Sequence, residues 1–243
     1  MRRLTRSPLA LLTIGAVLTA IVALAASVLL SAPSSSGSLV DPAEPAPTDL
    51  ASANTLGSAT APVTLDVYAD FQCPNCRAYA EQVEPRLVNA YVRPGTARIV
   101  LHDIAFLGKG SADTDESVQA AVAARCAEDQ GRFWSYQEYL FANQGAENTG
   151  AFKRSLFDAI ADRLNLNRTT FDACLSDPAR ASEIQTDTSR ALASGIHGTP
   201  TVLVNGKAVS SWGLSAISQA IDAAAAAPRS PSVTGAAARS PGA

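Results

Sequence analysis

Cys73 and Cys76 are the residues whose type and spacing could do chemistry, because only Pro74 and Asn75 separate the two thiols. The pair follows a strand-like run over Val63–Ala69 and precedes a helix-like run. The first backbone N–H groups of a helix lack partners within it, and the helix dipole favours an anion there. Cys73 is therefore the predicted nucleophile, and Cys76 lies one turn on, within reach of a disulfide. A half zinc site or an inert pair is the alternative.

The segments on either side of the pair must position it. Val63–Ala69 is apolar and rich in β-branched residues, which predicts a buried strand. A helix is expected from the cysteines to about residue 92, with a kink at Pro85. A turn at residues 93–95 leads to a second strand over residues 97–104. A strand, helix, strand unit of this kind normally has parallel strands.

The second half of the chain changes character twice. Residues 111–194 are rich in Ala, Glu, Gln, Arg and Leu at helical spacing, which predicts an inserted helical bundle. Residues 201–204 and 207–209 flank Asn205 and Gly206, and Asn-Gly is a strong signal for a two-residue hairpin turn. A final helix is expected over residues 214–227.

The N-terminus carries a membrane signal. Arg2, Arg3 and Arg6 precede residues 9–30, which contain no charged residue and are about as long as the ~20 residues of a membrane-spanning helix. The positive-inside rule places residues 1–7 in the cytoplasm and exports everything after an anchor at 8–31. A cleaved signal peptide is the alternative, although its apolar core is usually only ~7–15 residues long.

Composition bounds the remaining segments. Residues 32–60 are rich in Ser, Pro and Ala, which predicts a flexible linker, and residues 228–243 similarly predict a disordered tail. The folded domain is then expected at 61–227, in a compartment where disulfides persist. The formal net charge is −3, and the part after the three N-terminal arginines carries −6 without any basic cluster. This charge argues against nucleic-acid binding.

Three features together resemble a known family. They are the run Asp-Phe-Gln-Cys-Pro-Asn-Cys at 70–76, the helical block in mid-chain, and the run Gly-Thr-Pro-Thr-Val-Leu-Val-Asn-Gly at 198–206. In this order they resemble the thioredoxin superfamily, and more closely the DsbA-like thiol oxidoreductases, including membrane-anchored bacterial members of the actinobacterial type. The resemblance implies an α/β thioredoxin-like fold with a helical-bundle insertion between the strand-helix-strand unit and the C-terminal hairpin-helix unit.

The resemblance also implies a cis peptide bond between Thr199 and Pro200, in a loop packed against the cysteine pair; a trans proline that opens the strand is the alternative. One position departs from the family pattern. An acidic residue usually lies six positions before the leading cysteine, where Val67 stands here. Asp66 is adjacent, but alternation along a strand should turn it to the other face. His197 lies near the proline loop, either tuning the thiolate or serving as an ordinary loop residue.

Cys126 and Cys174 fall on separate helices of the expected insertion. In an exported chain, two such cysteines most simply form a structural disulfide, and related family members of the actinobacterial type have a comparable second bridge. The chain-entropy model gives such a bridge about 3–4 kcal/mol of stabilisation. A four-cysteine zinc site with the first pair is the disfavoured alternative because its spacing is unsuitable.

The leading hypothesis is an extracytoplasmic oxidase that donates the Cys73–Cys76 disulfide to exported proteins through a mixed disulfide. It needs no cofactor or metal, and Pro74, Asn75, Thr199 and Pro200 support the active site. Its expected partners are reduced exported proteins and, by resemblance, a quinone-coupled re-oxidase of the DsbB or VKOR type. A reductase, an isomerase, a membrane-tethered peptide-binding or chaperone module, and a Cu(I) carrier are the alternatives.

Overall fold

The structure, a computed structural model, describes residues 38–112 and 114–227 of the chain. The expected cytoplasmic segment, the anchor at 8–31, the first part of the linker and the tail at 228–243 lie outside these residues. No helix within the described ranges combines the length and the apolar character that crossing a membrane requires.

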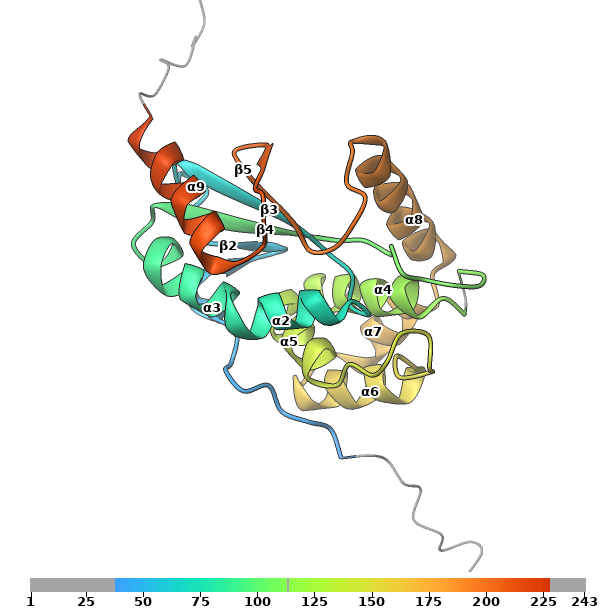
Figure 1. Ribbon diagram of the computed structural model, residues 1–243. Helices are drawn as coiled ribbons and strands as arrows, with labels where there is room; N and C mark the ends of the chain where they lie inside the picture. The colour runs from blue at the N-terminus through green and yellow to red at the C-terminus, as the bar shows by residue number, and fades with distance from the viewer. Residues whose placement is uncertain (1–37, 113, 228–243) are drawn as a thin grey trace, which may run out of the picture. The chain divides into compact units, whose positions relative to one another are not determined.

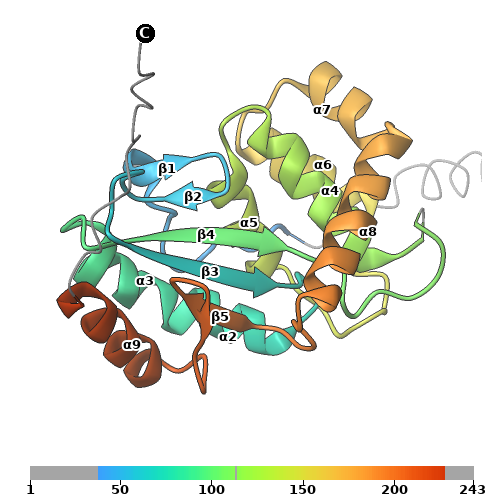
Figure 2. The same ribbon diagram turned by 90° about the horizontal axis from the view of Figure 1, so that it is seen from above.

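Two parallel strands, β3 (Val63–Ala69) and β4 (Ala97–Asp103), form the centre of the sheet. Every second residue of each strand is buried, which is the pattern of strands with one face in the core. The complete order is β1-β2-β4-β3-β5-β6, and all pairings except β3 with β4 are antiparallel. Figure 2 shows β3 and β4 pointing toward the helices of the insertion.

The strands are joined by a broken helix, as the sequence predicts. Helix α2 (Pro74–Gln82) ends before Val83, α3 (Glu84–Leu87) follows, and a π-helical turn, η2 (Val88–Val92), completes the connection. Pro85 lies in the first turn of α3, where its missing N–H removes no helical hydrogen bond. The helix is therefore interrupted just before Pro85. The proline then lies in the first turn of α3, where it is tolerated, instead of in the interior of α2, where it would remove a hydrogen bond.

The structure contradicts the expected flexible linker over residues 32–60 at residues 48–56. A 3₁₀ turn, η1 (Thr48–Leu50), leads into β1 (Ala51–Ser52) and β2 (Thr55–Leu56), and β2 pairs with the outer edge of β4. Leu56 is fully buried. Because the segment contains few apolar residues, its sequence did not indicate that Leu56 would be buried. The backbone hydrogen bonds at the open edge of the sheet supply the rest of the attachment of this segment.

Helices α4 to α8 form the insertion and occupy residues 116–193. Figure 2 shows α4, α7 and α8 on the side of the molecule toward which β3 and β4 point. Asp115 caps α4 by accepting from the Val118 N–H at 3.0 Å. Large aromatic side chains fill the interior of the bundle, Trp134 and Tyr136 among them. The helices are α4 (Glu116–Glu128), α5 (Phe133–Ala142), α6 (Arg154–Arg163), α7 (Arg168–Leu175) and α8 (Pro178–Ala193).

The C-terminal unit is the expected hairpin and helix. Strands β5 (Thr201–Val204) and β6 (Lys207–Ala208) flank Asn205 and Gly206, whose φ values of 47° and 76° are those that an Asn-Gly turn adopts. Helix α9 (Leu214–Ala226) packs on the side of the sheet that α2 and α3 also cover (Figure 1). The order strand, helix, strand, helical insertion, hairpin, helix is thus confirmed.

Candidate active site

The two thiols lie at the junction between β3 and α2. Cys73 is the N-cap residue of α2, with extended backbone angles, and Pro74 occupies the first helical position. The Cys73 carbonyl accepts from the N–H groups of Cys76 and Arg77, both at 3.1 Å. Pro74 and Asn75 are exposed, whereas both cysteines are buried free thiols. The sequence motif therefore places one sulfur at the positive end of the helix and the other one turn inside it.

The two sulfurs have opposite electrostatic environments. Hydrogen bonding from the Cys76 thiol, assisted by the Thr199 side chain and the N–H groups of Cys76 and Asn75, lowers the pKa of Cys73 from 9.0 to about 6 despite burial. Burial, followed by the hydrogen bond and charge of Cys73, raises the pKa of Cys76 well above its ordinary value. At neutral pH the leading thiol is therefore a thiolate and the second thiol keeps its proton.

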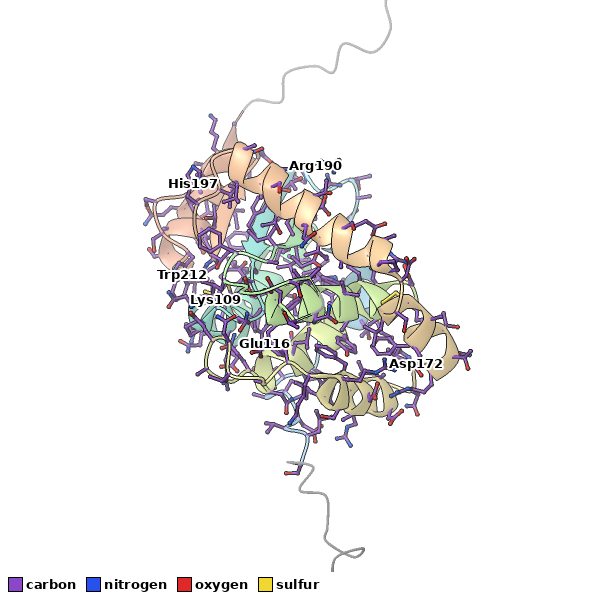
Figure 3. The ribbon with its side chains drawn as sticks, turned by 90° about the vertical axis from the view of Figure 1, so that its right-hand side faces the viewer. Lys109, Glu116, Asp172, Arg190, His197 and Trp212 are labelled. Atoms are coloured by element: carbon purple, nitrogen blue, oxygen red, sulfur yellow. A yellow bond between two sulfur atoms is a disulfide. The ribbon has the colours of Figure 1, made fainter. Side chains whose placement is uncertain are left out.

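The loop before β5 closes over the pair. The Thr199–Pro200 peptide bond is cis, and the Thr199 carbonyl oxygen lies 3.3 Å from Cys73 Sγ, where it accepts from the thiol while Cys73 is protonated. The Thr201 hydroxyl donates to the Gly198 carbonyl at 2.7 Å, and this bond fixes the conformation of the loop. His197 is exposed at the start of this loop (Figure 3). The structure thus brings Thr199 and Pro200 to the cysteines, while the His197 side chain is directed to solvent.

A buried polar network, whose members the sequence analysis did not identify as functional, braces the cysteine turn. The Asp70 carboxylate accepts from Gln72 N at 2.8 Å, from Leu107 N at 2.7 Å, and from the Ser117 hydroxyl at 2.8 and 2.9 Å. Gln72 in turn donates to Ser117 at 2.8 Å and accepts from Asn148 N at 2.6 Å. Asp70 sits in the quoted motif, but its partners come from α4 and two loops, so only the fold assembles the network.

Helix α5 and the loop after it also hold the turn. The side-chain amide of Gln144 donates to the carbonyls of Phe71 and Cys73, at 2.6 and 3.0 Å. The Phe71 and Phe141 rings contact each other with centroids 5.3 Å apart. The helical insertion therefore forms one wall of the active site and fixes the position of the first cysteine.

The strand beneath the site has the departure that the sequence indicated. Val67 is fully buried in the core. Asp66 faces the other side of the sheet, where its carboxylate lies 2.9 Å from His102 Nε2. His102 stacks on Tyr68. Neither residue of the pair 66–67 therefore offers a carboxylate to Cys76 on the active-site side of β3.

The second pair of cysteines has a different state. Cys126 on α4 and Cys174 on α7 are joined by a disulfide with a Cα–Cα distance of 5.7 Å (Figure 3). Because both sulfurs are in this bond, they cannot serve as thiolate ligands beside the first pair. The bridge ties two helices of the insertion together.

Comparison with known proteins places the chain in a family. A thioredoxin family model matches residues 51–223. The Disulfide bond formation protein D of Bacillus subtilis is 27% identical over 160 residues, which are 65% of this chain and 69% of that protein. The crystal structure of oxidised BdbD from Bacillus subtilis matches with a TM-score of 0.64 and 23% identity, covering 76% of this chain and 98% of that one. The thioredoxin-like α/β fold with a helical insertion is thereby confirmed.

Another relative is much longer than this chain. The Na(+)/H(+) antiporter NhaA 3 of Salinispora tropica is 34% identical over 62% of this chain, but the chain spans only 21% of the antiporter. The likeness concerns one part of that protein and carries no transport activity with it. The match of the family model and the geometry of the thiol pair agree: the chain belongs to the thioredoxin family and is a DsbA-like thiol-disulfide oxidoreductase.

Proposed function

We propose that the protein is an extracytoplasmic thiol oxidase that transfers the Cys73–Cys76 disulfide to exported proteins. The geometry that carries the proposal is the position of Cys73 as the N-cap of α2, with its pKa lowered to about 6 beside a Cys76 whose pKa is raised. A stabilised thiolate favours the reduced form of the pair, so the disulfide form is a stronger oxidant. The name of the Bacillus subtilis relative, a disulfide bond formation protein, points in the same direction.

The reaction follows from the arrangement of the two sulfurs. A client thiolate attacks Cys73 Sγ, the bond to Cys76 breaks, and Cys76 receives the electron pair and a proton. A second client thiolate then attacks the client sulfur of the mixed disulfide, and Cys73 leaves as a stable thiolate. Thr199 and Pro200, with the backbone of their loop beside Cys73, are the proposed contact for an extended client segment.

The proposed setting is the outer face of a membrane. The uncharged stretch at 9–30 behind three arginines supports a single-pass anchor over 8–31. Reduced exported proteins are the proposed clients, and a quinone-coupled membrane protein of the DsbB or VKOR type is the proposed re-oxidase. The Cys126–Cys174 bridge fits a compartment in which disulfides persist.

The redox equilibrium of the purified protein with glutathione tests the direction of transfer. We expect a potential between those of DsbA, about −120 mV, and of protein disulfide isomerase, about −180 mV. A potential near that of thioredoxin, about −270 mV, would instead indicate a reductase. The Cys73→Ser variant tests the non-catalytic alternative, because a peptide-binding module would keep its activity without this thiol.

A further inference from the structure

Residues 39–47, which we call the strap, precede η1 and are drawn in blue in Figure 1. The end of the strap nearer the sheet is fixed to the thioredoxin core. Ala46 and Leu50 pack against the hydrophobic core. Asp49 pairs with Arg93 at the end of η2, at 3.1 Å. From this point the chain continues directly into β1 and β2 at the edge of the sheet.

The other end of the strap is fastened to two successive turns of α5. Val40 uses both of its backbone groups: its N–H donates to Asn143 Oδ1 at 2.9 Å, and its carbonyl accepts from Asn143 Nδ2 at 2.8 Å. One turn earlier, the Tyr139 hydroxyl donates to the Asp41 carboxylate at 2.8 Å. Arg163 on α6 donates to both oxygens of that carboxylate at 2.6 Å. The strap thus joins two helices of the insertion to the thioredoxin core.

Asn143 is the residue through which the strap reaches the active site. It is the C-cap of α5, and its Nδ2 also donates to the Tyr139 carbonyl at 2.9 Å. Two of the three hydrogen bonds of its side chain are therefore made to Val40. Residues 144–153, all of them described, contain no helix or strand. The strap therefore fixes the last turn of α5 and the direction in which the chain leaves it.

Gln144 is the first residue after this cap, and it contacts the cysteine turn directly. Its side-chain amide donates to the Phe71 carbonyl at 2.6 Å and to the Cys73 carbonyl at 3.0 Å. The Cys73 carbonyl also accepts from the N–H groups of Cys76 and Arg77, both at 3.1 Å, where α2 begins. Gln144 therefore ties the first turn of α2 to the end of α5.

We propose that the strap is a positioning element of the active site: by fixing Asn143 it aims Gln144 at the Cys73 carbonyl and so holds the first turn of α2. The N–H groups of Asn75 and Cys76 in this turn bond to the Cys73 sulfur and lower its pKa. They do so only while the turn keeps its geometry, because hydrogen bonds weaken steeply with misalignment. The inference rests on the Cys73 thiolate that the proposed function uses. Asn143 and Gln144 are positioning residues, since both act through the backbone of the turn.

The test is the rate at which iodoacetamide alkylates Cys73 at pH 6, divided by the rate at pH 9. The full-length protein is used, with only the active-site pair reduced. The ratio reports the fraction of thiolate at pH 6, and a loss of stability alone does not change it while the variant stays folded. Gln144→Met keeps the length of the side chain but has no N–H donor, so it should lower the ratio about fivefold.

Releasing the strap should have a smaller effect in the same direction. Val40→Pro combined with Asp41→Ala removes the backbone donor at residue 40 and the carboxylate at 41, and should lower the ratio about twofold. Asn143→Ala opens the same attachment from the side of α5 and should also lower it. Circular dichroism checks that each variant is folded.

Two further variants make the comparison specific. Glu44→Ala is the matched control, because it removes the same charge as Asp41→Ala from another exposed position of the strap, and it should leave the ratio unchanged. Adding the strap release to Gln144→Met should lower the ratio no further than Gln144→Met alone, because both changes act on the same contact.

Three results would overturn the inference. The first is a folded Gln144→Met variant with the wild-type ratio. The second is a strap release with the wild-type ratio, which would show that the strap only adds stability. The third is a combined variant whose loss is the product of the two separate losses, since the strap would then act by another route. A wild-type ratio as low as that of free cysteine would instead remove the thiolate on which the proposed function depends, whatever the strap variants do.

Discussion

Cys73 and Cys76 are separated by two residues and are free thiols, whereas Cys126 and Cys174 are 48 positions apart and are joined by a disulfide. The first pair sits at the N-terminus of one helix, where hydrogen-bond donors converge on one sulfur and burial isolates the other. The second pair connects two helices of the insertion, α4 and α7. The position of a cysteine in the fold therefore decides whether it is a thiolate at a helix N-terminus or half of a cross-link between helices.

The largest expected effect separates the two pairs by activity. Cys73→Ser should abolish oxidation of a reduced model protein, because no sulfur at the helix N-terminus can form the mixed disulfide. The double variant Cys126→Ala and Cys174→Ala should keep most of the activity at a temperature where it is folded. The comparison would fail if the double variant lost exchange while still folded, as judged by circular dichroism.

For the free energy of unfolding, the Cys126–Cys174 pair should matter more than the Cys73–Cys76 pair. Removing the Cys126–Cys174 bridge should lower the free energy of unfolding by about 2–4 kcal/mol, since the unfolded chain gains the freedom of a long loop. Urea titrations of the oxidised wild type and of the double variant measure this difference. An unchanged urea midpoint would show that the bridge is not structural.

The pH dependence of the unfolding free energy should also distinguish the two cysteine pairs. Cys73 has a folded pKa of about 6, below its ordinary 9.0, so its thiolate stabilises the reduced folded protein. This contribution is complete above about pH 9, declines as the pH falls, and is lost below about 6. We expect the unfolding free energy of the wild type with Cys73 and Cys76 reduced, relative to that of Cys73→Ser, to rise from pH 6 to pH 9.

The bridged cysteines do not titrate and should add no slope to this series. Reducing only the first pair with a limited amount of dithiothreitol, followed by urea titration at each pH, makes the measurement. A flat difference between the wild type and Cys73→Ser would contradict the lowered pKa of Cys73.

The smallest expected effect concerns the brace of the first pair. Ser117→Ala removes one donor to Asp70 and one acceptor from Gln72, which should cost about 1–3 kcal/mol of stability. Exchange should slow modestly, because two backbone N–H groups still hold the Asp70 carboxylate. Ser182→Ala on the exposed surface of α8 is a matched control. An equal loss of stability in both variants would show that the buried network around Asp70 contributes no more than an exposed serine.

Local sequence patterns accounted for the elements whose signals lie within a few residues. The alternation of Val63–Ala69, the Asn205–Gly206 turn and the proline that breaks the helix each depend on neighbours in the chain. The segment at 48–56 escaped prediction because its two short strands have almost no pattern of their own. They exist because β4 offers an open edge and the core has room for Leu56.

The sequence by itself determined the thiol pair, its place at a helix N-terminus and the order of elements, because spacing, turn residues and apolar periodicity act over short distances. Only the tertiary structure decided which groups surround the pair. Asp70 meets Ser117 across 47 positions, and Gln144 meets Cys73 across 71. The protonation of a buried group depends on what packs around it, and that packing is assembled from segments remote in the chain.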